Sequence, residues 1–89
     1  MRILVVAEHD GRGVCAASRS ALAFARQCAA ASGGSVEWLL LGHQLGQAAA
    51  DAAAYAPVLV ADRPALAAPL AERYAPAIAS AVAERRADL

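Results

Sequence analysis

Three short apolar runs alternate with longer alanine-rich segments along this chain of 89 residues. The apolar runs lie at 3–7, 36–41 and 58–61, and their length and largely apolar character suit strands that are buried on both faces. The segments between them place apolar side chains at helical spacing, which predicts amphipathic helices. Strands that alternate with helices form parallel sheets with right-handed crossovers. The sequence therefore predicts an α/β fold with about three parallel strands in the order 3-2-1.

The first two predicted helices have clear boundaries. The first begins at Ser18, a good N-cap residue, and ends before Gly33, because glycine suits the left-handed conformation that follows a helix. At about 100° per residue, its apolar side includes Phe24 and Cys28, which are expected to pack in the core. The second predicted helix covers 44–55.

The third helical region is predicted to be interrupted. Asp62 and Pro64 have the order of a cap and a first-turn proline, so they predict the start of this region. Pro76 predicts a break, because proline lacks the amide hydrogen and clashes with the preceding turn. We therefore expect a short helix near 65–73 and a separate helix at 76–86.

Composition and charge exclude several classes of partner. Eight arginines balance eight acidic residues, and the chain has no lysine, so it lacks the basic surface that binds a phosphate backbone. Nucleic acid is therefore not an expected partner. No apolar run approaches the roughly 20 residues that cross a bilayer, so membrane insertion is not expected. The first strand begins almost directly after Met1, with no targeting peptide, which favours the bacterial cytoplasm.

Three charged or titratable residues, Glu8, His9 and Asp10, follow the first predicted strand. Ligands of open parallel sheets bind beyond the carboxyl ends of the strands, so these residues form the candidate site. A Gly-x-Gly pair comes next, but no third glycine follows at the spacing of a dinucleotide fingerprint, and the carboxylates would repel a pyrophosphate. We therefore interpret this loop as a turn in solvent or as a surface docked against another subunit or domain.

Catalysis and metal binding have weaker support. His9 beside Glu8 could act as a general base for a small enzyme with Cys15, but no pattern places a nucleophile against the imidazole. The cysteines and histidines lack the spacing of metal ligands. Gly42 and Gly46 resemble a phosphate-binding turn, but the lysine and hydroxyl residues of that motif are missing. A tight strand-to-helix connection explains the two glycines without a ligand.

The order of several motifs resembles one known family. They are the opening ILVVAEHD, the run WLLLGHQLGQAAADAAA, then VLVAD, and after a short gap LAERYAPAI. Together they resemble the N-terminal domain of the electron-transfer flavoprotein alpha (large) subunit, over essentially the whole chain. The short connection at 55–57 departs from the family, which usually has a Gly-Val stretch there.

The resemblance implies a three-layer, Rossmann-like fold of the adenine-nucleotide alpha-hydrolase type. It also implies that residues 1–89 are the N-terminal domain, or its first three βα units, of an alpha subunit paired with a beta subunit. Electrons would pass from flavin dehydrogenases to a respiratory acceptor, through FAD held by a C-terminal domain. No FAD-binding position of the family has a counterpart here, so we expect a docking scaffold that is not an enzyme and binds no FAD itself.

Two expectations stay open at the level of sequence. The alternative function is a stand-alone nucleotide-binding module that resembles universal stress proteins, although the glycine-rich phosphate loop of those proteins is missing. The order 3-2-1 also leaves the outer edge of the strand at 3–7 without a partner. We therefore expect the chain to self-associate through this edge or to be only marginally folded.

Overall fold

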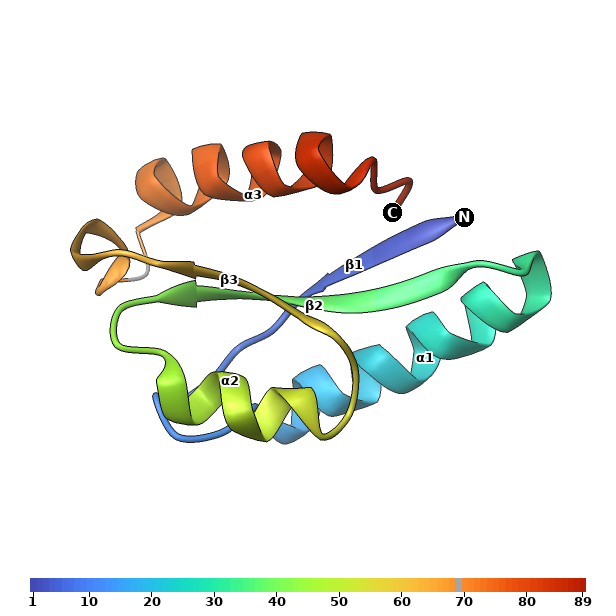
Figure 1. Ribbon diagram of the computed structural model, residues 1–89, viewed down its shortest axis with the longest axis horizontal. Helices are drawn as coiled ribbons and strands as arrows, with labels where there is room; N and C mark the ends of the chain where they lie inside the picture. Colours follow the sequence, from blue (N-terminus) through green and yellow to red (C-terminus); the bar gives the residue numbers. More distant parts are fainter. Residues whose placement is uncertain (69) are drawn as a thin grey trace.

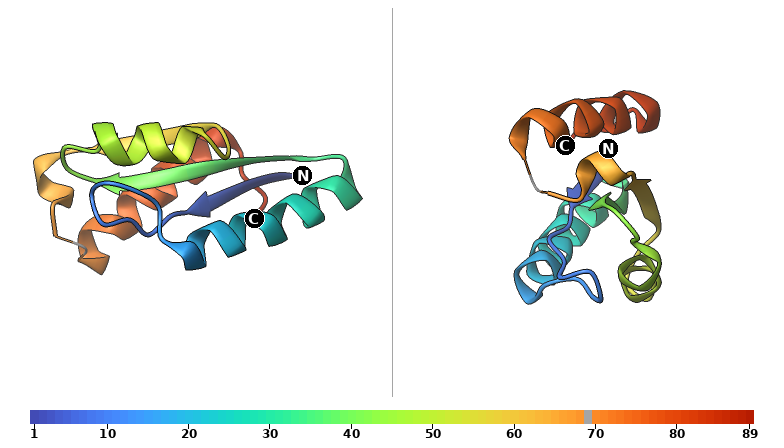
Figure 2. Two further views of the ribbon diagram at one scale, coloured as in Figure 1. Left: turned by 90° about the horizontal axis from the view of Figure 1, so that it is seen from below. Right: turned by 90° about the vertical axis from the view of Figure 1, so that its left-hand side faces the viewer.

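The computed structural model describes residues 1–68 and 70–89. Its elements are β1 (Arg2–Val6), α1 (Ala16–Ser32), β2 (Ser35–Gly42), α2 (Gly46–Ala53), β3 (Val58–Asp62), the 3-10 turn η1 (Pro64–Leu66) and α3 (Ala71–Arg85). The three strands form one parallel sheet in the order β1-β2-β3. Helices α1 and α2 lie against one face of the sheet and α3 lies against the other (Figures 1 and 2). The predicted α/β fold, and the strand order 3-2-1 with β1 at an edge, are confirmed.

Strand β2 is the centre of the core. Its residues 38–41 are at most 2% exposed, because β1 and β3 flank the strand and helices cover both of its faces. Trp38 pairs with Val5 of β1 and Val58 of β3. Its indole Nε1–H donates to the carbonyl of Ala52, over 3.0 Å, so the buried polar atom is satisfied.

Alternate residues of the strands face two separate hydrophobic clusters. The cluster between the sheet and helices α1 and α2 contains Ile3, Val5, Ala7, Val14, Leu22, Ala25, Ala29, Trp38, Leu40, Leu45, Ala48, Ala52 and Ala56. The cluster on the α3 side contains Leu4, Leu39, Leu41, Leu66 and Ala81. The alanines allow the helices to lie close to the sheet, while leucine and tryptophan from the strands fill the space between them.

Helix α1 differs from its prediction at its start and on one side. It begins at Ala16, so Ser18 is not the N-cap; the Ser18 hydroxyl is buried and accepts the Glu8 amide at 2.8 Å. Phe24, predicted to be buried, is 67% exposed, whereas Leu22 and Ala25 face the sheet. The apolar sector of α1 is therefore wider than the sheet can cover.

Helix α3 runs through Pro76 without a break, so the predicted interruption is wrong. The amides of Arg73 and Tyr74 both donate to the Leu70 carbonyl, which closes the first turn before the proline. Pro76 is exposed, while Tyr74, Ile78 and other residues one turn apart pack against the α3-side cluster. This packing outweighs the local preference against proline. The predicted separate helix at 65–73 is wrong: its start lies in η1, its residues 71–73 belong to α3, and its residue 69 lies outside the described residues.

The outer edge of β1 is partly covered, which corrects the expectation of a fully open edge. The last two residues of the chain lie along it: the Asp88 amide donates to the Arg2 carbonyl, and the Leu89 carbonyl accepts from the Leu4 amide, both over 2.8 Å. The Asp88 carboxylate also accepts the Arg2 amide. Figure 1 shows the two chain ends side by side at this edge. Within residues 1–68 and 70–89, no helix is long and apolar enough to span a membrane.

Replacing Pro76 with alanine should stabilise the chain. The change restores an amide that can donate to the Glu72 carbonyl and removes the ring that crowds it, so we expect a gain of about 1–3 kcal/mol in the free energy of unfolding. Urea melts followed by the fluorescence of Trp38, the single tryptophan, measure this gain. Ser80→Ala, at another exposed position of α3, is the control and should change stability by only a few tenths of a kcal/mol. No gain for Pro76→Ala would contradict a continuous helix.

Candidate functional site

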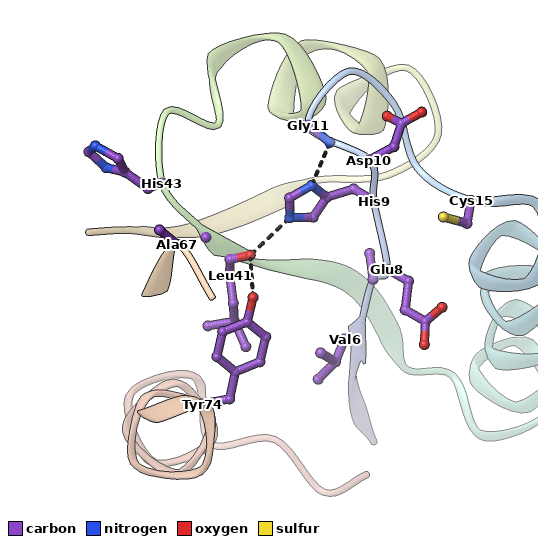
Figure 3. A pocket seen from close by; sticks show the side chains of 12 residues that line it. Val6, Glu8, His9, Asp10, Gly11, Cys15, Leu41, His43, Ala67 and Tyr74 are labelled. Atoms are coloured by element: carbon purple, nitrogen blue, oxygen red, sulfur yellow. Dashed lines mark hydrogen bonds between the residues drawn. The ribbon is translucent and has the colours of Figure 1, made fainter. Parts of the chain in front are cut away.

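A cavity of about 820 Å³ lies beyond the carboxyl ends of β1 and β2. Figure 3 shows its lining, which comes from the end of β1, the β1–α1 loop, the end of β2 and the start of α3. The lining residues are Val6, Ala7, Glu8, His9, Asp10, Gly11, Cys15, Leu41, Gly42, His43, Ala67 and Tyr74. The three predicted site residues, Glu8, His9 and Asp10, therefore share one cavity at the edge of the sheet where ligands of this fold class bind.

The β1–α1 loop is a short hairpin that leaves the sheet after Ala7. The Ala7 amide still donates to Leu39 in β2, and then the chain turns back on itself. The Cys15 amide donates to the Glu8 carbonyl at 2.9 Å, and His9 forms an antiparallel bridge with Val14. The hairpin fixes the backbone of all three predicted site residues and leaves the side chain of Glu8 exposed.

The imidazole of His9 takes the place of a strand amide. In a parallel ladder the next donor to β2 after Ala7 would be the amide of His9. Instead, the Nε2 of His9 lies 2.9 Å from the Leu41 carbonyl, and its Nδ1 accepts the Gly11 amide at 3.1 Å (Figure 3). These two partners define the neutral tautomer with hydrogen on Nε2. Because both ring nitrogens are engaged with the backbone, neither is free to take a proton from Cys15.

Gly42 permits this close approach of His9. A Cβ atom at position 42 would lie 3.4 Å from the imidazole ring and 2.9 Å from a methyl carbon of Leu45. The Tyr74 hydroxyl, on the other side of the sheet, donates to the Leu41 carbonyl that His9 also contacts, over 3.3 Å. The end of β2 therefore holds the β1–α1 loop and the start of α3 together.

The carboxylate of Asp10 stabilises its own turn. One oxygen accepts the amides of Arg12 and Gly13, each over 2.9 Å, which is the pattern of an Asx turn. Hydrogen bonds from the Gly13 and Arg12 amides hold the pKa of the Asp10 carboxyl below its usual value. Gly11 has a φ of 88°, a conformation that glycine adopts without steric cost.

Two further aspartates, which sequence analysis did not assign to the site, fasten the neighbouring backbone. Asp51 of α2 accepts the Val14 amide at 2.9 Å, so α2 is tied to the end of the β1–α1 loop. Asp62, at the end of β3, accepts the amides of Gln44 and Leu45 at 2.8 and 3.0 Å. The predicted role of Asp62 as the cap of the third helical region is wrong, because its carboxylate holds the start of α2 instead.

The environment of Asp62 favours its ionised form. The Leu45 and Gln44 amides lower the pKa of this carboxyl, with a smaller contribution from His43, whose Nδ1 lies 3.4 Å away. Gln44 itself has a φ of 57°, which is unusual for a residue other than glycine. The carboxylate therefore holds a turn that the local sequence does not favour. No pattern along the chain could reveal this contact, since it joins residues 18 positions apart.

The cavity has little machinery for catalysis or for binding anions. In the described part of the chain, no group of three or more potential metal ligands comes together, and no arginine lines the cavity. Six amides of the two loops already donate to His9 or to an aspartate; they belong to Gly11, Arg12, Gly13, Val14, Gln44 and Leu45. The site is therefore a fixed, acidic surface with an apolar floor at Val6 and Leu41.

A family model described as "Electron transfer flavoprotein domain" matches residues 3–89. The chain belongs to this family. The resemblance noted from its motifs is thus confirmed at the level of the family. Comparisons with curated proteins and with solved structures give no match. The three-stranded parallel sheet with helices on both faces is consistent with the Rossmann-like fold of an electron transfer flavoprotein domain.

Replacing Asp62 with asparagine should destabilise the chain at neutral pH and flatten its response to acid. Asparagine has one acceptor oxygen and turns an amide group toward the other backbone donor, so we expect Tm to fall by about 4–8 °C at pH 7. The folded-state pKa of Asp62 is depressed, so the stability that it contributes is present above its unfolded pKa and is lost as pH falls through the lower folded value.

Thermal melts at a series of pH values measure this effect. The difference in Tm between the native chain and Asp62→Asn should shrink steadily below about pH 4. Glu84→Gln, at an exposed carboxylate of α3, is the matched control and should leave Tm nearly unchanged. A difference that stays constant from pH 7 down to pH 2.5 would show that the charge of Asp62 is not what holds the turn.

Proposed function

We propose that these residues form a docking scaffold of an electron-transfer flavoprotein, with FAD held outside them. In this proposal they are the N-terminal domain, or its first three βα units, of an alpha subunit. The larger assembly carries electrons from flavin dehydrogenases to a respiratory acceptor. The family match supports the electron-transfer context. The bacterial cytoplasmic location expected from the sequence stays a prediction.

One observation carries the proposal: the loop amides just before α1 and α2, at the carboxyl edge of the sheet, donate to aspartates of the same chain. Flavin and adenine nucleotides are held in this fold class by amides at helix N-termini, which bind their phosphates. Here the Val14 amide, just before α1, donates to Asp51, and the Gln44 and Leu45 amides before α2 donate to Asp62. A phosphate would have to displace a carboxylate from each of these donors.

Charge adds to this argument. Glu8 and Asp10 line the cavity, and no arginine does so among the described residues, so a pyrophosphate there would lie close to two like charges. The residues present do not fit FAD or a free adenine nucleotide. We therefore assign no electron-transfer step to these side chains. Their proposed role is to dock residues 1–89 against the rest of the flavoprotein.

Glu8, His9 and Asp10 are the residues that we propose for the contact with the beta subunit or with the FAD domain. The hairpin holds their backbone before any partner arrives, so little conformational entropy is lost on docking. Glu8 and Asp10 are exposed at the rim, and the floor of the cavity is apolar. A partner segment with a basic residue beside an apolar one would complement this surface.

Titrations with FAD, AMP and ATP should give no binding up to millimolar concentration. Trp38 fluorescence and calorimetry both measure this, and the purified chain should show no flavin absorbance. Saturable binding of AMP or ATP would favour the alternative, a nucleotide-binding module resembling universal stress proteins. Saturable binding of FAD would contradict the proposal that the flavin lies elsewhere.

Reversing the charge of Glu8 should weaken docking without unfolding the chain. Among the described residues, Glu8 makes hydrogen bonds through its backbone amide and carbonyl alone, so Glu8→Arg should leave Tm within about 2 °C of the native value. We expect the affinity for an electron-transfer flavoprotein beta subunit joined to the FAD domain to fall about tenfold.

Calorimetry with that purified partner gives the two affinities. Glu84→Arg makes the same change of charge at an exposed position of α3, and should alter affinity less than twofold. Equal losses for the two variants would indicate a non-specific effect of net charge. Unchanged affinity for Glu8→Arg would overturn the assignment of the docking site to the carboxyl edge.

A further inference from the structure

The imidazole of His9 connects the β1–α1 loop to the end of β2. It is half-buried, with the Leu41 carbonyl 2.9 Å from Nε2 and the Gly11 amide 3.1 Å from Nδ1 (Figure 3). A carbonyl oxygen only accepts a hydrogen bond and a backbone amide only donates one, so the two partners fix the role of each ring nitrogen. The contacts therefore require a neutral ring with its hydrogen on Nε2.

Protonation affects these two contacts differently. Nε2 carries a hydrogen in the neutral and in the charged ring, so its bond to the Leu41 carbonyl persists. Nδ1 gives up its lone pair when it binds a proton, and two N–H groups then face each other at Gly11. The bond between His9 and Gly11 therefore exists only while the imidazole is neutral.

That bond sets the position of residues 10–13, which we call the Asp10 turn. Inside the turn, the Asp10 carboxylate accepts two amides, and the Asp10 amide donates to the Gly13 carbonyl at 3.3 Å. These bonds hold the turn together but do not connect it to the sheet. The Gly11 amide makes that connection, through a ring that is itself bonded to β2. Without it, the turn is free to move as a unit, and Asp10 moves with it.

Two histidines of this region change their charge near neutral pH. Histidine ordinarily titrates between about pH 5 and 8, and the chain contains His9 and His43. Backbone hydrogen bonds lower the pKa of the Asp10 and Asp62 carboxyls, so both stay ionised in this interval. The titratable or charged groups on the elements around the His9 ring are Glu8, Asp10, Arg12 and Cys15 of the loop, His43 after β2, Asp51 of α2, Asp62 of β3 and Tyr74 of α3.

The carboxylates near His9 are directed elsewhere. Those of Glu8 and Asp10 point away from the imidazole, and Asp10 is engaged with the amides of its own turn (Figure 3). Asp62 pairs with His43, at 3.4 Å. Within the described residues, a charged His9 ring therefore has no ion pair in its present position. The observed turn favours the neutral ring, and its bond to Gly11 is lost as pH falls.

We propose that His9 is a positioning residue that makes docking depend on pH: its neutral ring holds the Asp10 turn at the rim of the cavity, and protonation releases the turn. Docking is then strongest above about pH 7 and weakens as pH falls. A charged His9 also adds positive charge to a surface proposed for a basic partner residue, which acts in the same direction. This inference rests on the proposed function, because it describes how the same site is regulated.

NMR on the isolated chain tests the hydrogen bond without a partner. The ring nitrogen resonances of His9 at pH 7.5 should identify the neutral ring with its hydrogen on Nε2. Protection of the Gly11 amide, relative to an unstructured amide at the same pH, should fall about tenfold between pH 7.5 and pH 5.5. His9→Asn is the matched control, because its side-chain oxygen accepts the amide two residues on and does not titrate. Its Gly11 protection should be independent of pH.

Calorimetry with the beta subunit joined to the FAD domain measures the effect on docking. The affinity of the native chain should fall about tenfold between pH 7.5 and pH 5.5, whereas that of His9→Asn should change less than about threefold. His9→Gln replaces Nε2 but offers Gly11 no acceptor, so it should bind at pH 7.5 as weakly as the native chain does at pH 5.5. His43→Gln should retain the tenfold fall, because the bond between His9 and Gly11 is intact.

Three results would overturn the proposal, once thermal melts at both pH values have shown that each variant is folded. One is Gly11 protection in the native chain that does not change with pH. Another is native affinity that is equal at pH 5.5 and pH 7.5. The third is a fall in affinity as steep for His9→Asn as for the native chain, which would assign the pH dependence to another group. Absence of binding at pH 7.5 would contradict the proposed function alone, because the Gly11 measurement needs no partner.

Discussion

The burial of β2 on both faces is the constraint on which the rest of the structure depends. Residues 38–41 are almost fully buried. Strands β1 and β3 cover the two edges of β2, and helices must therefore cover its two faces. The indole of Trp38 also needs a hydrogen-bond partner, and it finds one in the carbonyl of Ala52. Ala48 and Ala52, each 0% exposed, let α2 come close enough for that contact. The position of α2 in turn brings Asp51 to the β1–α1 loop.

This arrangement gives the carboxyl edge of the sheet an unusual character for its fold class. The loop amides just before α1 and α2, at the edge where this fold class commonly holds a phosphate, donate here to side chains of the same chain. Asp10, Asp51 and Asp62 each accept loop amides, and His9 joins the loop to the Leu41 carbonyl near the end of β2. These internal hydrogen bonds fix the loops of the edge, which suits a surface that another polypeptide recognises.

The sequence predicts the strands well because each contains a short apolar run, which is typical of a buried parallel strand. It also predicts that Glu8, His9 and Asp10 lie at the carboxyl edge of the sheet, because they directly follow the first apolar run. It fails where a contact joins distant residues: nothing near Asp62 in the sequence indicates that its carboxylate holds the start of α2. The predictions that Phe24 is buried and that Pro76 breaks a helix are wrong for a related reason. The width of the sheet decides the exposure of Phe24, and the packing of α3 outweighs the local preference against proline.

Amide exchange measured by NMR on the isolated chain tests the central claim most directly, that internal acceptors close the carboxyl edge. The Gly13, Val14, Gln44 and Leu45 amides lie in or beside loops, where exchange is usually fast. The account predicts that they exchange about tenfold or more slowly than the amide of Arg63, a loop residue bonded only to a carbonyl. It also predicts that added AMP or FAD leaves these rates unchanged. Fast exchange at these positions, or new protection when a nucleotide is added, would show that the edge is open to phosphate and contradict the account.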